Sequence, residues 1–440
     1  MHGPRGEEKD FINARYEQMK DYTRLSAQGK LRGTLILWLL QEIAMDSIAQ
    51  PTANIAESAE RAARPLAARA AALPWYLYAT LFGSTSIAVG LLWDISWHAT
   101  IGRDTFWTPA HMAIYLGGVL AGLSAGWLAL ATTFAGSAAD RAAAVRFWGF
   151  RAPLGAWVVV WGTFAMLTSA PFDDWWHNAY GLDVKIISPP HMVLAAGMIA
   201  IQLGTMLLAV SWANRMPPAV QPRLRFAFAY ASGILLVLVG TMVLEYSEAN
   251  RQHSGLFYKV SAAVYPLVLL AVARAARLRW GATWTALSYM ALRLALLWIL
   301  PLFPARPLLA PIYNPVTHMW PTEFPLLLVL PALAVDLLVQ RFGTDKDGRL
   351  ALAAGGAFLA VLFVAQWFSA DFMLSPHARN WFFAADQWTY YNRPGPWHYQ
   401  FWDVDVDPVT PAKLGVALVL AAVSARLGLL WGNWMGRVRR

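Results

Sequence analysis

Long apolar runs recur along the chain at a nearly regular spacing. Most are about twenty residues long, the length that an α-helix needs to cross the hydrocarbon core of a bilayer. Only helices and closed barrels satisfy their backbone in lipid, and the alternating pattern of a membrane barrel is absent from the sequence. We therefore expect an all-α polytopic membrane protein with about ten transmembrane helices, at 74–97, 109–133, 152–172, 189–213, 224–246, 257–277, 281–303, 323–342, 349–370 and 412–434.

Basic residues are distributed unevenly between these runs. Residues 1–73 carry ten Lys and Arg, and alternate connections after them carry three each, whereas the intervening connections carry few. Membrane proteins keep basic residues in cytoplasmic loops, so the pattern predicts that both termini are cytoplasmic. The expected location is the bacterial inner (plasma) membrane. Because this rule also explains the net charge of +9, the lipid bilayer is the expected partner and no nucleic acid is expected.

The chain is expected to have three parts. Residues 1–73 form a cytoplasmic segment, in which 31–50 predicts an amphipathic helix in the membrane plane, with a soluble bundle helix as the alternative. Residues 74–215 form a four-helix membrane unit, and residues 216–440 add six further transmembrane helices. An aromatic outer loop at 371–411 is expected to lie in the interface as a belt or to cover a site as a lid.

Two predicted helical hairpins of the four-helix unit carry the same polar pattern. The first reads DISWHATIGRDTFWTPAH (94–111) and the second DDWWHNAYGLDVKIISPPH (173–191). In each, an Asp is followed four residues later by a His at a helix end, and a second His opens the next helix, two positions after a Pro. Residues four apart share a helix face, so each hairpin can bring a carboxylate and two imidazoles together. The candidate ligands are Asp94, His98, His111, Asp173, His177 and His191.

This set of side chains indicates transition-metal sites near the outer side of the membrane. Imidazole with carboxylate suits copper, zinc or iron(II). The chain has no Cys, which excludes thiolate sites. A single His near a helix end is more often an interfacial residue bonded to backbone or water, but repetition of the same order and spacing favours metal binding.

The first motif resembles the signature of the C subunit of the copper membrane monooxygenases, the family of the particulate methane and ammonia monooxygenases. The shared residues are Asp94, His98, Arg103, Asp104, Thr105, Thr108, Pro109 and His111. The second motif resembles a later one of that subunit, with Asp173 where the family has Asn, followed by His177, Asp183, Pro189 and His191. The likeness covers roughly residues 75–215.

The resemblance implies a copper at Asp94, His98 and His111, which would then be the catalytic residues. It also implies a neighbouring, alternative copper position that uses Asp173, His111 and His177. Arg103 and Asp104, and in the second motif Asp183, are expected beside the ligands. The implied activity is that of a membrane-embedded, copper-dependent oxidoreductase, which oxidises a small apolar substrate with dioxygen. Family C subunits work with two other membrane subunits, one of which bears a cupredoxin-like part, so such partners are expected.

Two other functions remain open from the sequence. A membrane copper or zinc transport protein would place ligands along a path through the middle of the membrane, whereas eight of the nine His here fall at the outer connections or helix ends. A non-catalytic metal-binding subunit of a larger complex is the other alternative. Three charges lie within predicted spans, and we expect Asp336 to pair with Arg293 or Arg426, with a proton or ion path as the alternative.

Overall fold

The computed structural model describes residues 74–102, 107–181, 188–308, 317–343, 346–384 and 407–440. These belong to one compact unit, Leu73–Arg440. The predicted amphipathic helix at 31–50 and the cytoplasmic segment that contains it lie outside the described residues, as does most of the aromatic outer loop.

The described part of the chain is almost entirely helical. Its long helices are α3 (Trp75–Thr100), α4 (Pro109–Phe134), α6 (Leu154–Tyr180), α7 (Pro189–Ala213), α8 (Gln221–Met242), α9 (Gly255–Ala275), α10 (Gly281–Ile299), α11 (Val329–Phe342), α12 (Asp347–Met373) and α13 (Pro411–Met435). The shorter elements are α5 (Ala138–Ala142), the 3-10 turns η1 (Leu244–Tyr246), η2 (Ala249–Arg251), η3 (Leu300–Leu302) and η4 (Pro376–Ala378), and the antiparallel strands β1 (Val145–Phe147) and β2 (Phe150–Ala152).

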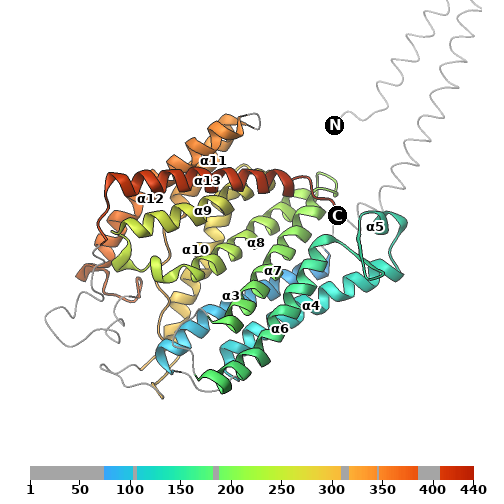
Figure 1. Cartoon of the computed structure of the whole chain (residues 1–440), viewed down its shortest axis with the longest axis horizontal. Coiled ribbons are helices and arrows are strands. Elements are labelled where there is room, and N and C mark those ends of the chain that lie inside the picture. The colour runs from blue at the N-terminus through green and yellow to red at the C-terminus, as the bar shows by residue number, and fades with distance from the viewer. Residues whose placement is uncertain (1–73, 103–106, 182–187, 309–316, 344–345, 385–406) are drawn as a thin grey trace, which may run out of the picture. The chain divides into compact units, whose positions relative to one another are not determined.

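Within the described ranges, nine helices are long and apolar enough to cross a membrane, with a mean hydropathy of 1.3 to 2.1 over their most apolar stretch. This confirms the all-α polytopic class. Figure 1 shows them side by side, with α3, α4, α6 and α7 on one side of the unit, α9, α12 and α13 on the other, and α8 and α10 between. The first group falls within residues 74–215, the range predicted for a four-helix unit.

The eighth predicted span, 323–342, differs from the expectation. Its helix, α11, begins only at Val329 and has 14 residues, too few to cross a bilayer alone. Pro321 and Pro325 explain the late start, because proline lacks the amide hydrogen of the helix ladder and forces the residue before it out of the helical conformation.

The residues directly before α11 form no helix and run largely buried through the bundle, where the backbone needs hydrogen-bond partners. Side chains of three helices supply them. Thr100 of α3 accepts from the Trp320 amide at 2.7 Å, and Gln366 of α12 accepts from the Leu327 amide at 3.1 Å. Arg293 of α10 donates to the Glu323 carbonyl at 3.3 Å. The broken span is therefore built into the protein rather than exposed to lipid.

The expected pairing of Asp336 with an arginine is wrong. The Asp336 carboxylate, 2% exposed, accepts hydrogen bonds from the amides of Ala282 and Thr283 and from the Thr283 hydroxyl, at 2.8 to 3.1 Å. It therefore caps the start of α10, where backbone N–H groups lack partners. Arg426 lies 3.4 Å from Asp347 instead.

Glycines set the close approach within both motif-bearing hairpins. A Cβ at Gly117 of α4 would lie 2.4 Å from the Gly83 carbonyl of α3, and one at Gly155 of α6 would lie 2.5 Å from the Gly204 carbonyl of α7. Small residues let membrane helices pack backbone to backbone in this way. The two hairpins are thus held by the same kind of contact.

We expect Gly117→Ala to destabilise the protein by about 1–3 kcal/mol, because the added methyl group must push two helix backbones apart. Gly126→Ala on the same helix is the matched control, since a Cβ there meets nothing within 4 Å. Unfolding in detergent followed by circular dichroism measures both. Equal stability of the two variants would show that the α3–α4 contact is looser than described.

Candidate metal centre

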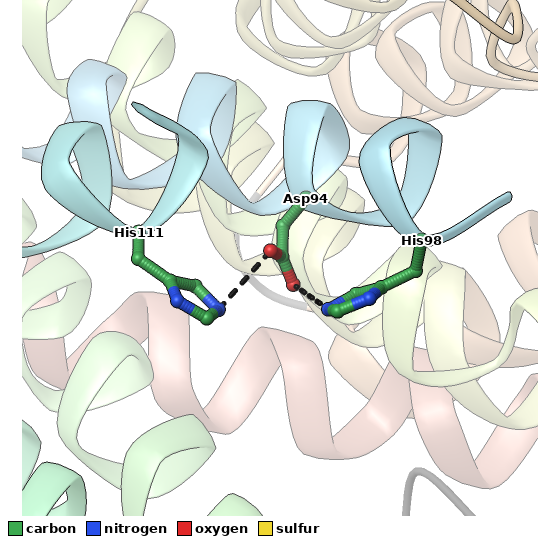
Figure 2. Close-up of side chains that lie close together, drawn as sticks. All are labelled: Asp94, His98 and His111. Atoms are coloured by element: carbon green, nitrogen blue, oxygen red, sulfur yellow. Dashed lines mark ion pairs between the residues drawn. The ribbon is translucent and has the colours of Figure 1, made fainter. Parts of the chain in front are cut away.

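The first cluster consists of Asp94, His98 and His111. Asp94 and His98 lie one turn apart near the end of α3, and His111 is the third residue of α4. One carboxylate oxygen of Asp94 lies 3.5 Å from His98 Nε2 and the other lies 3.1 Å from His111 Nε2. Figure 2 shows the carboxylate between the two imidazoles, with both ring nitrogens turned toward it.

The second cluster consists of Asp173, His177 and His191, and it repeats this geometry. Asp173 and His177 lie near the end of α6, and His191 is the third residue of α7. The Asp173 oxygens lie 3.3 Å from His177 Nε2 and 3.5 Å from His191 Nε2. In each cluster the ligand atoms lie within 4.8 Å of one another. The structure thus brings together both sets of three side chains that the sequence predicts.

The start of the second helix in each hairpin explains the shared register. Thr108 caps α4, its hydroxyl accepting the His111 amide at 3.2 Å, and Pro109 follows as the first helical residue. In α7, Ser188 stands at the N-cap position without a side-chain cap hydrogen bond, and Pro189 is the first helical residue. Proline suits this first position because its fixed φ is already helical and no amide partner is needed there. His111 and His191 therefore leave their helices at the same turn.

The donor geometry fits a bound cation. In each cluster the same atom, Oδ1 of the aspartate, is buried and accepts no hydrogen bond, although an imidazole nitrogen lies nearby. His177 Nδ1 lies 3.2 Å from the Gly181 carbonyl, which can only accept, so Nδ1 carries the proton. In the neutral ring, Nε2 then presents a lone pair to the Asp173 carboxylate, and these two electron-rich groups repel each other. A cation bound between them would attract both.

The distances also fit the size of a metal ion. Imidazole nitrogens and carboxylate oxygens bind a tetrahedral metal at roughly 2.0–2.2 Å, which places neighbouring ligand atoms about 3.3 Å apart. The four aspartate–histidine distances, 3.1 to 3.5 Å, are of this size, with each histidine of a cluster next to a different oxygen of the carboxylate. Three protein ligands leave at least one coordination position open, as in catalytic rather than structural metal sites.

Both clusters are partly accessible. Side-chain exposures are 18% for Asp94, 35% for His98 and 25% for His111, and 21–28% in the second cluster. The first cluster lies at the opposite end of the bundle from Asp347. Ala99, beside His98, packs with Trp320 and Met373 at the end of α12, whereas Asp347 begins that helix. An ion could thus enter at one end of the helices.

His111 belongs to the first cluster, and the structure groups Asp173 and His177 with His191 instead. This differs from the copper position implied by the resemblance, in which His111 joins Asp173 and His177. Arg103, Asp104 and Asp183, the residues expected beside the ligands, lie outside the described residues.

Tyr115 is a residue that the sequence pattern did not single out. It lies one turn after His111, and its hydroxyl is hydrogen-bonded to Ser169, one turn before Asp173. Both Asp94 and Asp173 act on it electrostatically. The i, i+4 spacing to each cluster was the available signal, but the contact joins α4 to α6 across a helix interface that the sequence does not specify.

Polar residues at other connections between the helices serve different contacts. Asp407 forms an ion pair with Lys413 and accepts the Leu256 amide at 2.8 Å, so it joins the starts of α9 and α13. The hydrogen bond from Lys413 holds the pKa of Asp407 below its usual range. His253 Nε2 lies 3.2 Å from Asp371 and 3.2 Å from the Trp367 carbonyl. In the described part of the chain, groups of three possible ligands occur at the two hairpins alone.

Comparisons with models of known protein families, with curated proteins and with solved structures give no match to this chain. The two clusters are therefore the features of the molecule that bear on its function.

Proposed function

We propose that the chain is a membrane-embedded, copper-dependent oxidoreductase that oxidises a small apolar substrate with dioxygen at the first cluster. The observation that carries this proposal is the convergence of Asp94, His98 and His111 on one point with a coordination position left open. The chemistry of the side chains accepts copper, zinc or iron. The motif's likeness to the copper membrane monooxygenases supports copper among the three.

The residues have separate tasks in this proposal. Asp94 contributes a negative charge that offsets part of the charge of the ion, and His98 and His111 fix its position from two helices. The end of α3 adds the negative pole of a helix dipole, which favours a cation. When bound, copper supplies the activation of dioxygen. The second cluster would hold a further ion in the same manner.

The surroundings support a substrate that arrives from lipid. Large apolar side chains next to the clusters in sequence are exposed on the helix ends, among them Trp107, Trp175 and Met192. Such a surface faces the membrane in a multi-pass protein and favours small apolar molecules over polar ones. We place the clusters on the outer side of a bacterial inner membrane, because the basic residues gather at the opposite ends of the helices.

The placement of the clusters favours an enzyme over a metal transporter. A transport path needs ligands through the middle of the membrane, whereas in the described ranges the three-ligand groups lie at helix ends. Electrons for the reaction would come from a partner. The described part is helical apart from one small hairpin, so a cupredoxin-like part would belong to another membrane subunit.

The test is oxygen incorporation. Protein purified in native lipid, loaded with copper and supplied with a reductant and short alkanes or ammonia, is expected to yield products that contain ¹⁸O from ¹⁸O₂. His98→Ala should abolish this product, and His318→Ala, an exposed histidine outside both clusters, should retain it. If both variants still yield labelled product, the proposal is wrong. Copper uptake into vesicles without any oxidation would also reject it.

A further inference from the structure

A polar cavity lies outside both metal clusters, beside the broken span before α11. Its lining includes Gly240 of α8, Tyr265 of α9, Tyr289 and Arg293 of α10, and Glu323. The space open to the centre of a water molecule is about 10 Å³. This is about the room that one ordered water needs, and such waters occupy sites with several polar partners.

Arg293 is buried without the partners that its charge requires. Its side chain is 5% exposed, and its Nε has no hydrogen-bond partner. Within the described residues, this guanidinium donates one hydrogen bond, from a terminal nitrogen to the Glu323 carbonyl at 3.3 Å. A charged group inside a membrane protein is costly unless it is paired and hydrogen-bonded. Support of the broken backbone therefore explains one nitrogen of Arg293 and leaves Nε without a partner in a residue that lines the cavity.

Glu323 lines the same cavity. Arg293 and Glu248 both act on the Glu323 carboxyl electrostatically. No ion pair within 4.0 Å joins it to Arg293 in the described part of the chain. Arg293, whose Nε lacks a partner, and Glu323, whose carboxyl forms no hydrogen bond or ion pair within the described residues, thus line one space of water size. One water can accept from the first and donate to the second.

The neighbouring polar side chains lack this arrangement. Gln366, 3% exposed, accepts the Leu327 amide and donates to Gln252 at 2.7 Å, and Gln252 in turn donates to the Ser247 carbonyl at 2.9 Å. That network is complete and structural. The cavity between Arg293 and Glu323 differs because both of its charged groups retain unused hydrogen-bonding capacity.

We propose that Glu323 is a proton-binding site inside the helix bundle, which exchanges its proton through water held between its carboxyl and Arg293. The site is independent of metal at the two clusters, so it goes beyond the proposed oxidation. Glu323 is less buried than Arg293, and both residues line the cavity that would hold the water.

The charged and titratable groups around Glu323 come from three further segments. Arg293 and Tyr289 belong to α10, Tyr265 belongs to α9, and Glu248 lies between η1 and η2. Burial raises the pKa of Glu248, with Glu245 adding to the shift and Arg251, 3.6 Å away, opposing it. A carboxyl at this place is therefore surrounded by one fixed positive charge and a second carboxyl.

Infrared difference spectroscopy of the whole protein in lipid tests the proposal. The carbonyl stretch of a protonated carboxylic acid is expected to appear as the pH falls from about 9 to about 5, to shift in D₂O and to be missing in Glu323→Gln. Glu248→Gln should keep the band. If no band in this range is removed by Glu323→Gln, the proposal is wrong.

A second variant tests the role of the cavity without touching a charged group. A Cβ at Gly240 would lie 3.5 Å from the Tyr265 hydroxyl, an ordinary contact, so Gly240→Ala fills part of the cavity without a clash. Loss of a water that donates to the carboxylate should raise the titration midpoint by about one pH unit. Gly356→Ala, with its nearest contact also at 3.5 Å, is the matched control. Equal midpoints in both glycine variants would overturn the exchange through cavity water.

Discussion

His98→Ala and His191→Ala are each expected to lower the bound metal from two ions per chain to one. Each variant removes one of three ligands from one cluster and leaves the other cluster intact. Elemental analysis after removal of loosely bound metal measures the stoichiometry, with His318→Ala as the control for a histidine outside both clusters. The double variant should bind none. A wild-type protein without metal would contradict the assignment of both clusters.

The same series separates two arrangements of ligands. The structure places His111 with Asp94 and His98 and places His191 with Asp173 and His177. His111→Ala should therefore spare the second ion, and His191→Ala should remove it. The monooxygenase resemblance implies instead that His111 lies beside Asp173 and His177. In that arrangement, His111→Ala would affect both metal positions, and His191→Ala would affect neither. Electron paramagnetic resonance of the copper-loaded variants identifies which signal is lost.

The two clusters could be predicted from the sequence because their geometry is local. Four residues of helix place Asp94 and His98 on one face, and a proline start fixes where His111 leaves the next helix. Glycine contacts hold the two helices of the hairpin close together, so the helices have little freedom to shift and the three side chains stay near one another. The second hairpin repeats the same order and spacing of Asp and His, which argues against a chance pattern. The long apolar runs were equally direct, since length and composition alone decide whether a helix can cross a bilayer.

Features that depend on contacts between distant segments could not be predicted. The run 323–342 is apolar enough for a span, yet its first residues form no helix and are hydrogen-bonded to α10 and α12. Asp336 accepts hydrogen bonds from helix amides rather than pairing with an arginine. The sequence does not show which helix start will lie beside a given carboxylate, so this contact could not be predicted. The cavity beside Arg293 needs four segments that span Gly240 to Leu326. No periodicity along the chain brings these residues together.

Asp173→Asn is expected to weaken metal binding at the second cluster at least about 100-fold, since substitution of groups that merely support a ligand already costs 10- to 100-fold. The change keeps the size of the side chain but removes the negative charge that faces both imidazoles at 3.3 and 3.5 Å. Asp94→Asn should have the same effect at the first cluster. Competition with a chelator of known affinity measures both.

Asp174→Asn provides the matched control, because the neighbouring carboxylate is exposed and contacts Asn178 rather than a histidine. The asparagine found at this position in the monooxygenase family sharpens the test. If Asp173→Asn binds copper as tightly as the unchanged protein, the carboxylate is not a ligand, and the two histidines alone hold the ion as they would beside a neutral amide. If affinity falls while Asp174→Asn is unaffected, the negative charge is required, and the second cluster of this chain binds its ion in the same way as the first.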